Sequence, residues 1–313
     1  MRRDTRRLFE AKARELEPKF RDAFLQAIAD IKRAADIERI ARLLEQGDVA
    51  GVIEALRLDD DIFAPLREAM RQAYLEGGGI IGEALPKKNP ATGYEIVFRF
   101  DGYHDTAERW LREKAGDLIK DIADGERSSL REALVRSLHQ GRNPKQAALD
   151  LVGRVHGGKR VGGIIGLTGR EKGYVAGYRE KLVSEDRKAD QIDRMVAKYE
   201  NKLLRLRGER IARTETLEAM HAGRYRGMDQ LIERGEVKAD AVTKTWDATG
   251  DARTRPAHMA MDRQTVKFRE PFRAPNGSLL MHPCDNSLGA RPEDVIQCRC
   301  WAAIKIDYFA DLD

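Results

Sequence analysis

The sequence predicts a mainly α-helical protein in which a multi-helix body precedes a small C-terminal α+β module with a short-stranded sheet. Apolar residues recur at helical spacing through the first three quarters of the chain. Charged residues make up 35% and aromatic residues 6% of the 313 residues, a mixture typical of helices with long charged faces. Near residue 240 the apolar period changes from 3.6 to 2, and Gly and Pro become frequent.

The first helical region is predicted to span residues 1–76. Its opening segment is expected to form an amphipathic helix in which Pro18 marks a kink or a break. Two shorter amphipathic segments follow, and glycines at 47 and at 77–79 are predicted to end them. The opening helix has one apolar face, which consists of Leu8, Leu16, Phe20, Phe24, Ile28 and Ile31.

Residues 77–102 are predicted to form an irregular arm or linker. Two prolines and several glycines interrupt the helical period there, before a strand-like segment at 94–100. Helices resume in a body that spans residues 103–235. The chain therefore divides, in order, into two helical regions separated by an arm, followed by the module at 240–313.

Local motifs predict several helix ends within the body. Asn143 and Pro144 have the residue types of an N-cap and a first helical position. Thr168 and Glu171 have the spacing of a capping box. The glycine-rich segment 157–166 resembles a phosphate-binding loop but lacks the Lys-Ser/Thr ending of a P-loop, so a flexible linker is the preferred interpretation.

Basic residues are unevenly distributed, although the net charge is only +5. Residues 1–21 and residues 198–226 each hold eight Lys/Arg against four Asp/Glu. Such surpluses predict sequence-independent contacts with the phosphates of double-stranded DNA, with ordinary solvated helix faces as the alternative. The candidate DNA-binding residues are Lys159, Arg160, Lys202, Arg205, Arg207 and Arg210.

The segment "VIQCRCWAAIKIDY" of the C-terminal module alternates in polarity. Its even-numbered positions from Ile296 to Tyr308 are apolar and most odd-numbered positions are polar, which predicts a half-buried strand with Cys298 and Cys300 on its inner face. Burial in apolar surroundings raises the pKa of a thiol, so a catalytic cysteine is not expected.

Two interpretations of this cysteine pair stay open. Cys298 and Cys300 are either small core residues or half of a structural Zn²⁺ site, since two thiolates on one face of a strand can converge on a metal. The preferred prediction is no metal and no cofactor. In the alternative, the remaining ligands come from His258, His282 or Cys284, with His258 and Cys284 as the first choice.

No catalytic residue is predicted. Asp251, Arg253, Arg255, His258 and Asp262 occur within twelve residues, but charge pairing within a loop explains such a group as well as chemistry does. The alternative is an enzyme, either a nuclease or a transferase.

That enzyme would use Arg213, Glu215, Asp251 and His258.

Three cysteines cannot form a disulfide framework, no apolar run approaches the length of a membrane span, and the N-terminus lacks a secretory signal. We therefore expect a protein made and kept in a reducing cytoplasm, with no membrane contact.

The order of these motifs resembles the Mu F-like phage head morphogenesis family over about residues 100–301. The resemblance is carried by "IARTET", by "TWDATGDARTRPAHMAMDRQTV" and by "PEDVIQCRC". The matching positions are Arg213, Thr214, Glu215, Trp246, Asp251, Arg253, Arg255, His258, Asp262, Gln264, Pro283, Cys298, Arg299 and Cys300.

The resemblance implies a phage minor head protein that is not an enzyme. It implies association with the portal, with the major capsid or scaffolding protein as further candidate partners, and a role in capsid assembly and DNA packaging or delivery. It also implies assembly in the bacterial host cytoplasm, followed by a place inside the virion capsid near the portal.

Overall fold

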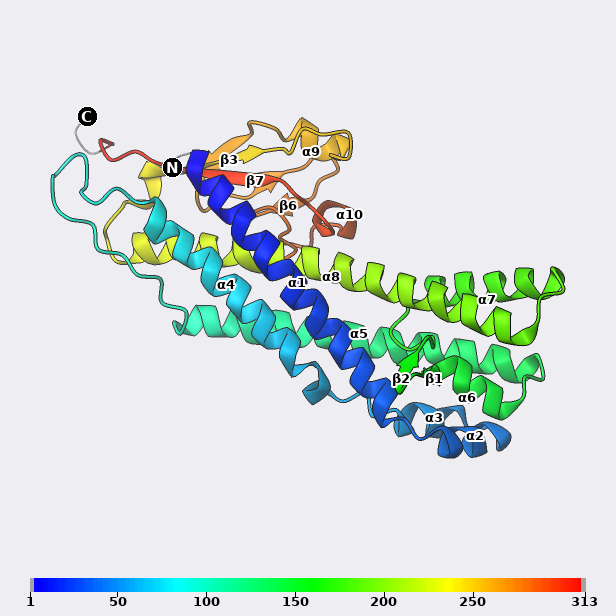
Figure 1. The fold of residues 1–313 in the computed structure, drawn as a ribbon. Helices are drawn as coiled ribbons and strands as arrows, with labels where there is room; N and C mark the ends of the chain where they lie inside the picture. The colour runs from blue at the N-terminus through cyan, green and yellow to red at the C-terminus, as the bar shows by residue number, and fades with distance from the viewer. Residues whose placement is uncertain (1–2, 311–313) are drawn as a thin grey trace. The chain divides into compact units, whose positions relative to one another are not determined.

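The fold is given by a computed structural model that describes residues 3–310 (Figure 1). Long helices dominate this part of the chain, and small antiparallel sheets lie near its C-terminal end, which confirms the predicted fold class. The α-helices are α1 Arg3–Ala34, α2 Ile37–Glu45, α3 Val49–Ala55, α4 Ala64–Ala84, α5 Asp105–His139, α6 Pro144–Val152, α7 Gly169–Ser184, α8 Ala189–Glu233, α9 Pro256–Ala260 and α10 Pro292–Val295.

The strands are short. They are β1 Arg154–His156, β2 Lys159–Val161, β3 Val242–Asp247, β4 Thr265–Lys267, β5 Phe272–Arg273, β6 Leu279–Leu280 and β7 Trp301–Ile306, and two 3-10 turns span Asp60–Phe63 and Ala239–Ala241. The three-stranded sheet has the order β4-β3-β7, and both of its pairings are antiparallel.

The residue contacts divide the chain into two compact units that interleave along the sequence. Unit 1 consists of residues 1–20, 68–112 and 210–313, and unit 2 consists of 21–67 and 113–209. The sequence-based division was instead into consecutive segments, namely 1–76, 77–102, 103–235 and 240–313. The difference arises because α1, α4, α5 and α8 each contribute residues to both units.

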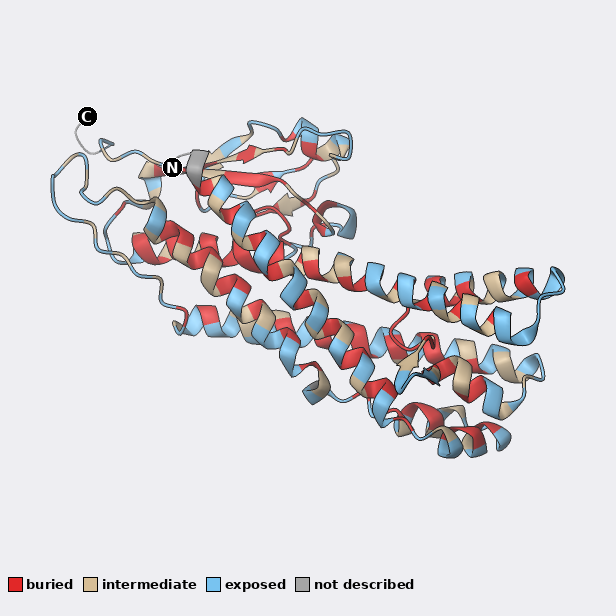
Figure 2. Ribbon diagram, in the orientation of Figure 1, coloured by how far each residue is buried: buried red, intermediate tan, exposed pale blue. Residues whose placement is uncertain are grey.

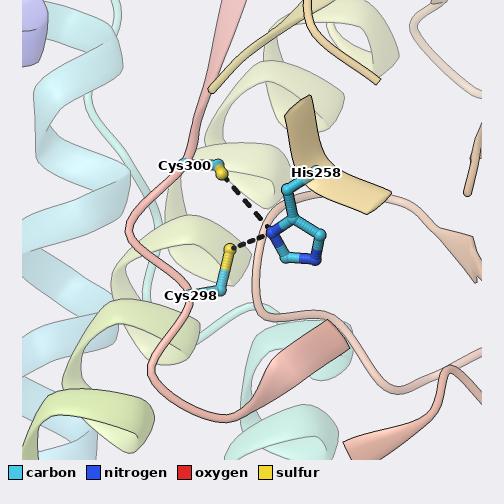
Figure 3. A group of neighbouring side chains, drawn as sticks. All are labelled: His258, Cys298 and Cys300. Atoms are coloured by element: carbon cyan, nitrogen blue, oxygen red, sulfur yellow. Dashed lines mark hydrogen bonds between the residues drawn. The ribbon is translucent and has the colours of Figure 1, made fainter. Parts of the chain in front are cut away.

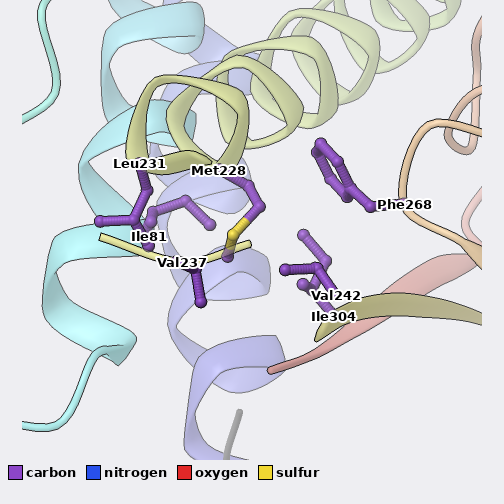
Figure 4. Packing of buried hydrophobic residues seen from close by; sticks show 7 residues of the cluster. All are labelled: Ile81, Met228, Leu231, Val237, Val242, Phe268 and Ile304. Atoms are coloured by element: carbon purple, nitrogen blue, oxygen red, sulfur yellow. The ribbon is translucent and has the colours of Figure 1, made fainter. Parts of the chain in front are cut away.

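Unit 1 has an apolar core where the module meets the ends of two long helices. The strand β3 alternates between buried and partly exposed positions, as a period of two requires. Figure 4 shows the side chains of α4, α8, β3 and β7 that converge in this core. The cluster consists of Ile81, Met228, Leu231, Val237, Val242, Phe268 and Ile304.

Helix α4 does not end at its glycines, so the prediction that residues 77–84 belong to an irregular arm was wrong. The glycines at 77–79 lie inside the helix, which continues to Ala84. A Cβ atom on Gly77 would lie 2.1 Å from the carbonyl oxygen of Met220 in α8, and one on Gly223 would lie 1.9 Å from that of Tyr74. The glycines therefore permit a close approach of two helix backbones inside unit 1 and do not terminate α4.

The strand predicted over residues 296–308 is shorter than the alternation suggested. It begins at Trp301 and ends at Ile306, and Ile296 follows α10 as a residue that is 47% exposed. Gln297 has a φ of 55°, in the left-handed region, which interrupts any extended run. Cys298 and Cys300 are buried as predicted, but they lie in the loop before β7.

The glycine-rich segment of unit 2 is an ordered hairpin and turn, so its interpretation as a flexible linker was wrong. Strands β1 and β2 pair across Gly157 and Gly158. The turn that follows is held by the buried Lys32 ammonium, which donates to the carbonyl oxygens of Gly162 and Gly163 at 2.8 and 2.9 Å.

Local helix signals in unit 2 were predicted correctly. The Asn143 side chain caps α6 with Pro144 in its first turn, and Thr168 with Glu171 forms the capping box of α7. Buried and exposed residues alternate along the long helices at helical spacing (Figure 2). Helix α1 continues through Pro18 without ending.

Candidate functional site

A histidine and two cysteines converge inside the C-terminal module of unit 1. His258 comes from α9, and Cys298 and Cys300 come from the loop between α10 and β7 (Figure 3). The Nδ1 atom of His258 lies 3.5 Å from the Sγ atom of each cysteine. All three ligand atoms lie within 4.8 Å of one another, and all three residues are buried.

Motif residues hold the loop that carries the two cysteines. The Thr214 hydroxyl of α8 accepts a hydrogen bond from the Gln297 backbone at 3.1 Å, and Arg255 donates to the carbonyl oxygen of Ile296. Arg299 makes two 2.7 Å hydrogen bonds to the carboxylate of Asp251. The residues on both sides of Cys298 therefore make hydrogen bonds to segments that are far away in the sequence.

A third thiol borders this cluster. Cys284 is fully buried, and its Sγ donates to the carbonyl oxygen of Cys298 at 3.3 Å. Its φ of 68° lies in the left-handed region that non-glycine residues seldom adopt. His282, the other predicted ligand candidate on this segment, instead lies parallel to the His221 ring at 6.2 Å and tilted against the Tyr225 ring at 6.0 Å.

A buried carboxylate lies behind the histidine. Asp294 Oδ1 is 3.5 Å from His258 Nε2, and both side chains are 1% exposed. The other oxygen of Asp294 accepts from Asn276 Nδ2 at 2.7 Å and from Ser278 Oγ at 2.8 Å, which fixes the orientation of the carboxylate. The Trp246 ring meets the His258 ring edge to face at 5.4 Å.

The protonated thiols are poor nucleophiles in this setting. The hydrogen-bonding thiol of Cys284 and burial raise the pKa of Cys298 well above its usual range. The thiol of Cys298 and burial do the same to the pKa of Cys300, against a smaller opposing effect of His258. A thiol that attacks a substrate at neutral pH needs a lowered pKa. The cluster can hold a thiophilic metal, for which the thiols would be deprotonated by coordination.

The residues of the alternative enzyme are engaged in separate contacts. Arg213 Nε pairs with Glu17 at 3.4 Å, Asp251 pairs with Arg299, and His258 faces the two cysteines. A cavity of about 330 Å³ in unit 1 is lined by Arg213 but not by Glu215, Asp251 or His258. The four residues therefore do not line a common cavity in this part of the structure.

Other motif residues support the backbone around the cluster. The carboxylate of Asp262 accepts from the Ala248 backbone at 2.9 Å, and the Gln264 side chain makes two hydrogen bonds to the Arg273 backbone. Arg253 lines the cavity, and Pro283 directly precedes Cys284.

Several residues of the predicted DNA-binding set are used internally. Arg207 is buried, donates to the carbonyl oxygen of Gly166 at 2.7 Å and lies over the Phe24 ring, so it is not available to phosphate. Arg160 donates to the Gly153 carbonyl at 3.1 Å.

Lys159, Lys202, Arg205 and Arg210 are exposed, and Arg205 pairs with Glu209 four residues on. Not every basic residue of the 198–226 segment is available to a ligand, because some are buried inside unit 1. Arg224 is buried against Trp301 and donates to the Ala302 carbonyl.

Two residues of this region were missed by sequence reasoning. Asp294 lies four residues before Cys298, in a stretch where an acidic residue after a proline suggests only the first turn of a helix. Lys244 lies on the buried face of β3, where burial lowers its pKa to about 7 against the opposing effects of Asp285 and Glu270. The alternation of β3 places Lys244 on the inner face, so the sequence pattern alone could have predicted that Lys244 is buried.

Comparisons with known proteins identify one family. A family model described as Phage Mu protein F like protein matches residues 128–303, which is more than half of the chain and includes the whole cluster. No curated protein and no solved structure matches the chain. No helix among residues 3–310 combines the length and the apolarity needed to cross a lipid bilayer.

Proposed function

The chain belongs to the Phage Mu protein F like family, and from this premise we propose that it acts as a phage head morphogenesis protein. The observation that carries the proposal is the match over residues 128–303, which includes Arg213, Asp251, His258 and the Cys298–Cys300 pair. The protein would assemble in the host cytoplasm and take its place inside the virion head.

The partner proposed for this role is the phage portal, and the proposed process is DNA packaging or delivery. The support is the family membership together with the portal association that the sequence resemblance implies. The major capsid and scaffolding proteins are further candidates.

Co-expression of the full chain with its cognate portal tests this partnership. We expect the two proteins to copurify through a tag on the portal and to sediment together in a sucrose gradient. The untagged portal and a tagged, unrelated ring protein are the controls. Two separately folded proteins that fail to associate at any ratio would contradict the portal assignment.

A second proposed property is non-specific DNA binding by one face of α8. Lys198, Lys202 and Arg205 are exposed and spaced at four and three residues, so they share a side of the helix within unit 2. A helix face with three cations can contact backbone phosphates without reading bases. Because Arg207 is buried, this stripe replaces the wider set expected from the sequence.

Filter binding over a range of salt concentrations tests the α8 stripe. Substituting Glu for Lys198, Lys202 and Arg205 should weaken binding and reduce the slope of log K against log salt by about 3, since each phosphate contact contributes about 0.9. The matched control substitutes Glu for Lys87, Lys88 and Lys305, which are also exposed. Equal losses in both triple variants would show that only net charge matters.

We propose a structural role without catalysis. The support is the family membership together with the separate ion pairs of Arg213 and Asp251 and the raised pKa of both loop thiols. A nuclease assay of the wild type against the Glu215→Ala/His258→Ala variant tests this. Metal-dependent cleavage lost in a folded double variant would establish the alternative.

A further inference from the structure

We infer that the C-terminal module holds a structural Zn²⁺ ion through His258 Nδ1 and the thiolates of Cys298 and Cys300, with Cys284 as the fourth ligand. These four residues come from three segments of unit 1: helix α9, the loop after β6 and the loop before β7. No residue of the proposed DNA stripe or portal role is needed for this inference.

The distances match a tetrahedral site. Zinc binds imidazole nitrogen at about 2.0–2.1 Å and thiolate sulfur at about 2.3 Å, so the tetrahedral edge between them is about 3.6 Å. The observed separations from His258 Nδ1 to the sulfur atoms of Cys298 and Cys300 are both 3.5 Å. Two edges of one face of the coordination sphere therefore already have the required length, and the two sulfur atoms lie within 4.8 Å of each other.

Hydrogen bonding alone does not account for this arrangement. A ring nitrogen has either one proton or one lone pair, so His258 Nδ1 can make one good hydrogen bond. It instead lies at equal distance from Cys298 Sγ and Cys300 Sγ (Figure 3). A metal between the three atoms would satisfy all of them, and each thiol proton would pass to solvent on coordination.

Cys284 completes the proposed ligand set, although its thiol is not among the three ligand atoms that lie within 4.8 Å of one another and would have to turn toward them when the ion binds. Its thiol donates a hydrogen bond to the carbonyl oxygen of Cys298 at 3.3 Å. In the described part of the chain five non-glycine residues have positive φ, and Cys284 and Gln297 are two of them. Unfavourable backbone angles persist where the surrounding structure requires them, and Gln297 directly precedes Cys298.

A buried carboxylate faces the ring nitrogen of His258 that would not bind the ion. In metal sites the histidine nitrogen that does not bind the ion donates to a carboxylate, which orients the ring. His258 Nε2 has no hydrogen-bond partner at normal length, yet Asp294 Oδ1 faces it at 3.5 Å. Asn276 and Ser278 hold the other oxygen of Asp294.

The ligand chemistry selects the class of metal. Thiolate and imidazole ligands favour zinc and exclude magnesium or calcium, which prefer oxygen. The module that contains the cluster has short strands, of which the longest are the six-residue β3 and β7. An ion that joins α9 to two loops would stabilise such a module, since the free energy of metal binding adds to that of folding.

Metal analysis of the full chain tests the inference. The protein is purified through a tag without histidine, and zinc is measured by mass spectrometry. We expect about one zinc per chain and, by X-ray absorption, mixed sulfur and nitrogen ligands at about 2.3 and 2.0 Å. Replacement of zinc by cobalt should give the visible absorption of a tetrahedral thiolate complex, and a strong chelator should lower the melting temperature.

Single substitutions identify the ligands. His258→Ala, Cys298→Ser, Cys300→Ser and Cys284→Ser should each lose most of the zinc. The matched control is His156→Ala, because His156 is an exposed histidine in the β1–β2 hairpin of unit 2. It should keep full zinc content and the wild-type melting temperature.

Three results would overturn the assignment. A folded wild type that holds no zinc, takes up none on reconstitution and melts equally with and without chelator would overturn the site. Full zinc content in His258→Ala or Cys298→Ser would overturn the ligand set, and full content in Cys284→Ser would overturn the fourth ligand. If the variants do not fold, the zinc content and X-ray absorption spectrum of the wild type decide.

Discussion

The close packing of α4 against α8 in unit 1 makes Gly223→Ala the most direct test of the fold. The added methyl group would lie 1.9 Å from the Tyr74 carbonyl oxygen, whereas ordinary contacts begin near 3.4 Å. The two backbones must therefore separate locally by about 1.5 Å. Overpacking of this kind costs about 1–3 kcal/mol, and the better helix propensity of alanine returns at most about 1 kcal/mol. We expect a net loss of about 2 kcal/mol.

Gly79→Ala is the matched control, because a Cβ atom at Gly79 in α4 meets nothing within 4 Å. This variant should gain up to about 1 kcal/mol from helix propensity. Urea unfolding followed by far-UV circular dichroism gives both stabilities, and hydrogen exchange over 68–84 and 214–228 locates the change. If Gly223→Ala is as stable as Gly79→Ala, the close helix approach is wrong.

Three further perturbations follow from buried groups. Because burial lowers the pKa of Lys244 to about 7, the unfolded chain binds more protons than the folded chain between about pH 7 and pH 10. The free energy of unfolding should therefore rise with pH over that range, by up to about 1.4 kcal/mol per pH unit. Urea unfolding measured at each pH gives this slope, and the Lys244→Met variant should show a smaller one. Glu126→Ala leaves the buried ammonium of Lys172, 2.9 Å away, without its counter-ion and should lower the free energy of unfolding by about 3–5 kcal/mol. The Glu126→Leu/Lys172→Met double variant removes both charges and should lower it clearly less. Equal losses in the two variants would contradict the pairing. Gly163→Ala adds a Cβ atom 2.5 Å from the Gly153 backbone nitrogen at a φ of 83°, so its melting temperature should fall, and an unchanged value would contradict the tight turn.

The predictions that held depend on neighbours close in sequence. The cap at Asn143 and the capping box at Thr168 involve residues three positions apart, so their partners are visible in the sequence itself. The burial of Cys298 and Cys300 followed from alternation with flanking apolar residues. The alternation also suggested a strand that begins too early, because it does not reveal the left-handed backbone of Gln297.

The predictions that failed depend on contacts between distant segments. Glycines at 77–79 suggest a helix end, yet packing against α8 keeps them helical. Arg207 has the appearance of a solvated cation, yet the Gly166 carbonyl, the Phe24 ring and Glu126 surround it in unit 2. In each case the partner lies at least forty residues away, and nothing in the residues next to the glycines or to Arg207 indicates it.

The candidate site shows the same division between local and distant information. The sequence by itself determined that the protein is mainly helical, that the period changes near residue 240 and that two thiols near the C-terminus are buried, because these properties depend on residue types within a few positions. Only the tertiary structure decided that His258, forty residues before Cys298, lies 3.5 Å from it, and that Asp294 stands behind the ring. The chain must turn through α9, three short strands and α10 between these residues, and their final separation depends on the packing of the whole module.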